Sequence, residues 1–94
     1  MPRFKVAHIR QQGVDLIIIP LDDNFHYKPR NEQVAAKAEL QARTSNAGLA
    51  GAVVPVWETP DGRMAFDAPQ NWHPFFKSID LGFVLANINR ELYW

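Results

Sequence analysis

The chain contains no cysteine, and this absence excludes disulfides, thiolate nucleophiles and zinc sites with cysteine ligands. It also lacks long apolar runs. A run such as residues 16–21 is far shorter than the roughly 20 apolar residues that cross a bilayer. The opening residues MPRFK do not form the apolar stretch of about seven to fifteen residues found in a secretory signal. We therefore expect a soluble cytoplasmic protein that does not associate with membranes.

Net charge is also absent. Ten Lys and Arg residues balance ten Asp and Glu residues, so the formal charge is zero. No net field steers such a chain toward nucleic acid. Hydrophobic residues make up 47% of the sequence, and neutrality removes long-range repulsion between copies. The composition therefore favours a protein partner, with a homodimer as the first expectation, over a nucleic acid.

The first half of the chain predicts a hairpin followed by a helix. Residues 4–11 and 14–21 suit strands joined by a turn at Gln12-Gly13. The consecutive apolar residues 16–19 leave both faces of the second strand apolar, which is typical of a strand inside a sheet. Residues 31–46 predict a helix that begins at an asparagine cap.

The second half repeats this plan. Residues 49–58 predict a third strand, and Pro55 within it indicates a sheet edge or a bulge, because proline donates no ladder hydrogen bond. A turn leads into a short fourth strand at residues 63–68. The final helix, predicted from about residue 80 to Leu92, carries apolar residues at helical spacing. These residues are Leu81, Val84, Leu85, Ile88 and Leu92.

The order β-β-α-β-β-α predicts a single α+β domain over residues 1–94, built as a two-layer sandwich. We expect a four-stranded antiparallel sheet with two helices on one face. The predicted strand order is 1-2-4-3, a cyclic permutation of the ferredoxin-like arrangement. This order places the apolar second strand inside the sheet and the Pro55 strand at an edge. It leaves strand edges and one sheet face open, which again favours a homodimer.

Large aromatic residues gather in the segment 69–77, PQNWHPFFK, and at the end of the sequence. Aromatic side chains are enriched at protein interfaces, and they also fill one end of a small core. Both interpretations remain open for this segment and for the final Tyr-Trp pair. The hypothetical partner-binding residues are Trp57, Trp72, Phe75, Phe76, Tyr93 and Trp94.

The connector at residues 25–30, FHYKPR, suggests an alternative function, single-stranded nucleic-acid binding, because it interleaves rings with positive charge. A hydrated connector whose Phe25 packs on the helix is the competing interpretation. The candidate nucleic-acid-binding residues are Arg3, Lys5, Arg10, Phe25, His26, Tyr27, Lys28 and Arg30.

A third hypothesis is a small metal-dependent or hydrolytic enzyme built on Asp22, Asp23 and His26. Adjacent carboxyl groups can shift each other's pKa and serve proton or metal chemistry. The histidine spacing matches no established metal-ligand motif, and carboxyl groups in loops commonly cap turns. The sequence therefore assigns no catalytic residue, no metal ligand and no cofactor. It predicts a small non-enzymatic binding or regulatory accessory domain that acts through protein contacts.

Overall fold

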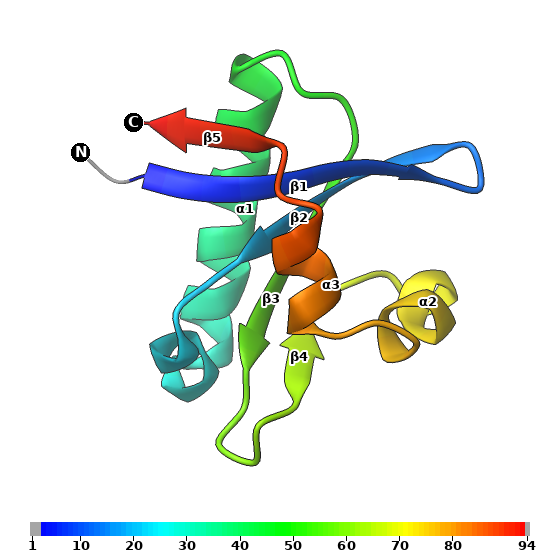
Figure 1. Ribbon diagram of the computed structural model, residues 1–94. Coiled ribbons are helices and arrows are strands. Elements are labelled where there is room, and N and C mark those ends of the chain that lie inside the picture. The colour runs from blue at the N-terminus through cyan, green and yellow to red at the C-terminus, as the bar shows by residue number, and fades with distance from the viewer. Residues whose placement is uncertain (1–2, 94) are drawn as a thin grey trace.

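The computed structural model describes residues 3–93, and the side chains of residues 4–92. It is a mixed domain of strands and helices (Figure 1). None of the helices in this described range has both the length and the apolar character needed to cross a membrane. The elements in chain order are β1 (Arg3–Gln11), β2 (Val14–Pro20), the 3-10 helix η1 (Asp23–Tyr27), α1 (Arg30–Asn46), β3 (Ala52–Glu58), β4 (Met64–Phe66), the 3-10 helix η2 (Gln70–Trp72), α2 (His73–Lys77), α3 (Leu81–Ala86) and β5 (Arg90–Tyr93).

Within residues 3–93, five strands form one sheet in the spatial order β4-β3-β2-β1-β5. β1 is antiparallel to both of its neighbours, and β3 is antiparallel to β4. β2 and β3 instead run parallel, and α1 makes the crossover between them (Figure 1). The crossover is required because a tight turn cannot join parallel neighbours.

β2 lies at the centre of the sheet. Leu16, Ile17, Ile18 and Ile19 are all 0% exposed. Successive side chains of a strand point to opposite faces. Ile17 and Ile19 therefore enter the core under α1, while Leu16 and Ile18 enter the core on the other face. The prediction of an apolar second strand inside the sheet is confirmed.

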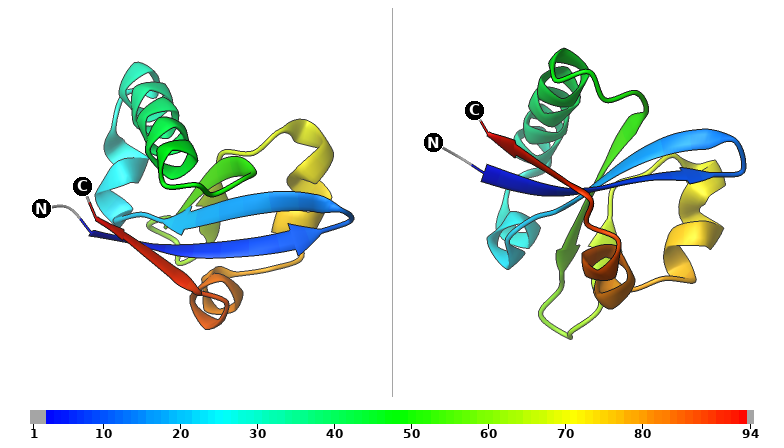
Figure 2. Two further views of the ribbon diagram at one scale, coloured as in Figure 1. Left: turned by 90° about the horizontal axis from the view of Figure 1, so that it is seen from above. Right: turned by 45° about the horizontal axis from the view of Figure 1, so that its top comes forward.

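Helices cover both faces of the sheet, so the prediction of two helices on a single face is wrong. α1 contributes Leu40 to one core, whereas η2, α2 and α3 contribute Trp72, Phe76 and Val84 to the other. Figure 2 shows α1 and α3 on opposite sides of the strands. The physical reason is β2, because a strand that is apolar on both faces needs cover on both.

The predicted four-stranded antiparallel sheet with the order 1-2-4-3 is also wrong. β3 pairs directly with β2, and β4 lies outside it, so Pro55 sits in an interior strand. The Pro55 carbonyl accepts from the Asp67 N–H at 3.1 Å, which places the proline nitrogen on the β4 side as well. β4 has already ended at Phe66. The missing N–H therefore costs no ladder hydrogen bond to β2.

The closing segment is not one continuous helix. α3 ends at Ala86, and Arg90–Tyr93 pairs with β1 as β5. Two asparagines interrupt the helix. Asn87 donates from Nδ2 to the Phe83 carbonyl at 2.8 Å, and Asn89 bonds to the β1 backbone. Asparagine competes for backbone groups and favours helix ends, so the apolar spacing alone overestimated the helix.

Candidate functional site

The aromatic residues predicted to form one contact surface lie on both sides of the sheet. Trp72 and Phe76, 9% and 1% exposed, belong to the core beneath α2 and α3. Phe75 is half-buried beside Phe76. Trp57 is buried on the α1 side, where its ring meets Phe25 edge-on with centroids 4.7 Å apart. These four candidate residues therefore fill the fold and present little surface.

Three candidate positions fall outside what the structure describes. They are the side chains of Arg3 and Tyr93, and the whole of Trp94.

An open hollow of about 700 Å³ lies between the β3–β4 turn and the loop that joins α2 to α3. We call it the β4 hollow. The Phe66 and Phe76 rings stack there with centroids 5.3 Å apart, so its floor is continuous with the core. Its lining combines the apolar side chains of Met64, Phe66, Phe76, Ile79 and Leu81 with the charged side chains of Glu58, Arg63, Lys77 and Asp80.

Local hydrogen bonds shape both walls of the β4 hollow. In the turn, the Thr59 N–H donates to the Arg63 carbonyl at 2.8 Å, and the Thr59 hydroxyl donates to Asp61. The second bond holds the pKa of Asp61 below its ordinary value. On the other wall, Asp80 caps α3 by accepting from the Phe83 N–H at 2.9 Å. Both walls therefore hold their charged groups on ordered backbone.

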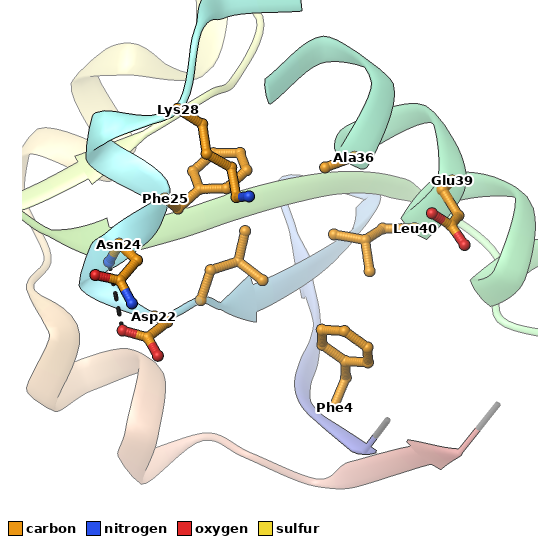
Figure 3. Close-up of a pocket in the computed structure, with 9 residues that line it drawn as sticks. Phe4, Asp22, Asn24, Phe25, Lys28, Ala36, Glu39 and Leu40 are labelled. Atoms are coloured by element: carbon orange, nitrogen blue, oxygen red, sulfur yellow. Dashed lines mark hydrogen bonds between the residues drawn. The ribbon is translucent and has the colours of Figure 1, made fainter. Parts of the chain in front are cut away.

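A second site is an apolar pocket of about 350 Å³ between α1, η1 and the adjoining ends of β1 and β2 (Figure 3). We call it the α1 pocket. Figure 3 shows Phe4, Phe25 and Leu40 directed from three different elements toward one space. The apolar lining consists of Phe4, Leu21, Phe25, Ala36 and Leu40, and the exposed residues Asp22, Asn24, Lys28 and Glu39 form the rim.

The η1 wall of the α1 pocket is held by two side-chain hydrogen bonds from neighbouring elements. Gln33 of α1 donates from Nε2 to the Phe25 carbonyl at 3.0 Å. The Trp57 indole N–H of β3 donates to Nδ1 of His26 at 3.3 Å. Together with the edge-on ring contact to Trp57, these bonds fix Phe25, which is only 4% exposed. The pocket is therefore formed by the fold before any ligand arrives.

The charged groups at the rim of the α1 pocket differ in their partners. A hydrogen bond between the Asp22 and Asp23 carboxyl groups lowers the pKa of Asp22 and raises the pKa of Asp23. Glu39 pairs with Arg43 at 3.7 Å. The Lys28 ammonium forms no hydrogen bond or ion pair with any other residue in the described range. The only rim charge without a partner there is thus a cation.

The connector residues proposed for nucleic-acid binding are mostly exposed. Tyr27 is 72% exposed, and the His26 ring meets it edge-on at 5.4 Å. Lys28 and Arg30 are exposed as well, although Arg30 pairs with Asp67 at 3.1 Å. Phe25 instead points inward, as the competing interpretation of this segment suggested.

The basic residues of β1 are spread along the strand. Lys5 lies near η1, because it lines an open hollow together with Asp22. Arg10 lies five positions further along the strand, roughly 16 Å away at the usual rise per residue, and faces Asp15 of β2 in the register. Of these two described side chains, Lys5 and Arg10, only Lys5 is therefore close enough to extend a surface around η1.

The histidines hold loops rather than gather with acidic groups. His8 and His73 each place Nε2 on a carbonyl, that of Ala50 at 2.8 Å and that of Ala68 at 3.0 Å. His26 accepts from Trp57. Within residues 3–93, no three His, Asp or Glu side chains converge in a way that could hold a metal ion.

Sequence reasoning missed the α1 pocket. One local signal existed, since the small Ala36 lies one helical turn before Leu40 and leaves room beside the larger side chain. The opposite wall comes from Phe4, on a strand distant in sequence. No local pattern indicates that these residues meet.

Comparisons with protein families, with curated proteins and with solved structures found no match to this chain. The two sites are therefore interpreted from their own geometry and chemistry.

Proposed function

We propose that the protein is a non-enzymatic binding or regulatory accessory domain that acts through protein–protein contacts, with the β4 hollow as its contact surface. A second copy of the chain is the partner that this surface fits best. The observation that carries the proposal is the mixed charge of the hollow, whose lining contains two basic and two acidic side chains together with an apolar floor.

A twofold contact brings the same patch of two copies together, so each charge must meet an opposite charge. Arg63 and Lys77 supply the positive charges of the β4 hollow, and Glu58 and Asp80 supply the negative ones. Such a mixed patch is complementary to itself, whereas a patch of one sign repels its copy. The zero formal charge of the whole chain adds no long-range repulsion.

The β4 hollow also borders an open edge of the sheet. β4 is the last strand on that side, and the half-buried Met64 and Phe66 side chains line the hollow. Methionine and aromatic side chains inside a polar rim are typical of protein interfaces. A second copy would cover these side chains and the strand edge together.

Sedimentation equilibrium over a range of concentrations tests the proposal. We expect a reversible dimer of the wild-type chain. In the proposed dimer, Lys77 of one copy faces Glu58 of the other. Lys77→Glu therefore places two negative charges opposite each other and should weaken the dimer by about tenfold or more. Adding Glu58→Lys restores an opposite pair and should recover the dimer.

Arg10→Glu is the control, because it makes the same charge change on the β1–β2 hairpin and should leave the dimer intact. A wild-type chain that remains monomeric at millimolar concentration contradicts the proposal. So does a Lys77→Glu variant that dimerises as strongly as the wild type.

One observation favours a second candidate function, single-stranded nucleic-acid binding. Tyr27 is 72% exposed next to the unpaired Lys28, and an exposed ring beside a cation can stack on a base and contact its phosphate. Fluorescence anisotropy with a labelled single-stranded oligonucleotide tests this candidate. The affinity should fall with salt, and Tyr27→Ala should weaken it more than Tyr27→Phe. Absence of binding at low salt removes it.

A further inference from the structure

We infer that the α1 pocket binds a straight-chain aliphatic monocarboxylate, that is, a fatty acid of medium length. This inference goes beyond the proposed protein contact, since the α1 pocket and the β4 hollow adjoin the cores on opposite faces of the sheet.

The size of the pocket sets the length of the ligand. A volume of about 350 Å³ lies in the lower part of the range for small-molecule sites, roughly 300–1,000 Å³. At the ~30 Å³ that a water-sized group occupies in a liquid, this volume holds about a dozen heavy atoms. Carboxylates of about eight to ten carbons, such as octanoate and decanoate, have that size.

The lining requires that the buried part of the ligand be apolar. The side chains of Phe4, Leu21 and Leu40 close the interior. These side chains are hydrocarbon throughout, so they offer a ligand no polar atom. A polar group placed there would lose its hydration without compensation, whereas an alkyl chain gains free energy with each methylene that it buries.

The rim selects the head group. Lys28 reaches over Phe25 at the edge of the pocket (Figure 3), and its ammonium has no partner within the described range. An anionic head at this position would form a charge-assisted hydrogen bond. The pocket therefore offers an apolar interior next to one available positive charge, which is the pattern of a fatty acid.

The other rim charges limit the head to one negative charge. Asp22, whose pKa is lowered by its hydrogen bond with Asp23, remains ionised. Glu39 borders the pocket from α1 (Figure 3). These carboxylates repel a second anionic group. A monocarboxylate thus fits the rim better than a dicarboxylate or a phosphate monoester.

A series of ligands with increasing chain length tests the apolar part. Isothermal titration calorimetry with hexanoate, octanoate, decanoate and tetradecanoate, each below its micelle concentration, gives the affinities. Burial of one methylene should strengthen binding by about fourfold, so each step of two carbons up to decanoate should gain roughly fifteenfold. Tetradecanoate should gain nothing further, because its tail exceeds the pocket. An affinity independent of chain length would overturn the inference.

Octanol and octylamine test the head group with the same tail. We expect both to bind at least about tenfold more weakly than octanoate. Lys28→Gln should weaken octanoate by a similar factor and leave octanol unchanged, and Lys28→Arg should retain octanoate binding. Equal affinities for octanoate and octylamine, or an unchanged affinity in Lys28→Gln, would contradict the assignment.

Ala36→Leu tests the location, because the larger side chain fills the pocket from α1. Ala38→Leu is the matched control on an exposed position of the same helix. Ala36→Leu should abolish octanoate binding, and Ala38→Leu should preserve it. If Ala36→Leu fails to fold, the variants Lys28→Gln and Lys28→Arg test the location instead, because Lys28 is exposed and its substitution should not disturb folding. Lys77→Glu, the dimer variant, should bind octanoate normally, so failure of one proposal is distinguishable from failure of the other.

Discussion

Asn89 holds the backbone of His8 with one side chain. Its Oδ1 accepts from the His8 N–H at 2.9 Å, and its Nδ2 donates to the His8 carbonyl at 2.8 Å. The Asn89 N–H also donates to the Val6 carbonyl at 3.0 Å. The amide thus continues the β1–β5 ladder where β5 begins. The Asn89 side chain therefore supports the register that places Leu92 opposite Phe4. Phe4 in turn forms one wall of the α1 pocket.

We expect Asn89→Ala to lower the free energy of unfolding by about 1–3 kcal/mol, because two backbone groups of His8 lose their partner. Asn87→Ala is the control. It removes one hydrogen bond, to the Phe83 carbonyl, and should cost about 0.5–1.5 kcal/mol. Urea denaturation measures both variants. Equal losses would show that the second side-chain hydrogen bond of Asn89 adds nothing to stability.

Gly51 approaches β2 so closely that no side chain fits. A Cβ at Gly51 would meet the Asp15 carbonyl oxygen at 2.6 Å, and φ is +129°. Gly48 also has a positive φ, +84°, but a Cβ there would meet nothing within 4 Å. We expect Gly51→Ala to cost at least ~2 kcal/mol, since backbone strain and a clash add. Gly48→Ala should cost about 1 kcal/mol. Thermal unfolding of both variants gives the comparison.

The parts of the fold that the sequence predicted depend on strong local signals. The apolar run 16–19 indicated an interior strand, and it occupies the centre of the sheet. Gln12-Gly13 indicated a hairpin turn, and both residues have positive φ, as a tight hairpin requires. In these cases the residue pattern itself carries the physical constraint, whatever lies elsewhere in the chain.

The remaining features depend on contacts between distant residues. Pro55 indicated an edge strand or a bulge, but β4 is too short to need the missing N–H, so β3 stays inside the sheet. Apolar residues at helical spacing continue to Leu92, yet Asn89 finds a better partner in β1 than in a helix. The α1 pocket joins Phe4 to Leu40. The sequence around one residue of such a pair does not indicate which distant residue it contacts.

Asp23 should titrate at a higher pH than an ordinary aspartate because of its neighbour Asp22. The hydrogen bond between the two carboxyl groups needs a protonated Asp23, so it is present at low pH and lost as the pH rises through the raised pKa of Asp23. We expect Asp22→Asn to lower the pKa of Asp23 toward its ordinary value. Glu58→Gln is the control and should lower it less, because Glu58 is the weakest of the contributions that raise it. Carbon-detected NMR titration of the carboxyl groups measures each shift. A larger decrease in the pKa of Asp23 in Glu58→Gln than in Asp22→Asn would contradict this pairing.

Phe76 decides whether the aromatic segment serves the core or a contact surface. The ring is 1% exposed and stacks on Phe66, so Phe76→Leu should lower the free energy of unfolding by about 1–2 kcal/mol. Phe75→Leu should cost less, since Phe75 is only half-buried. Chemical denaturation and sedimentation equilibrium on the same variants separate the two roles. A Phe76→Leu chain with unchanged stability but a weaker dimer would assign the ring to the contact surface, because a core residue cannot lose volume without destabilising the monomer.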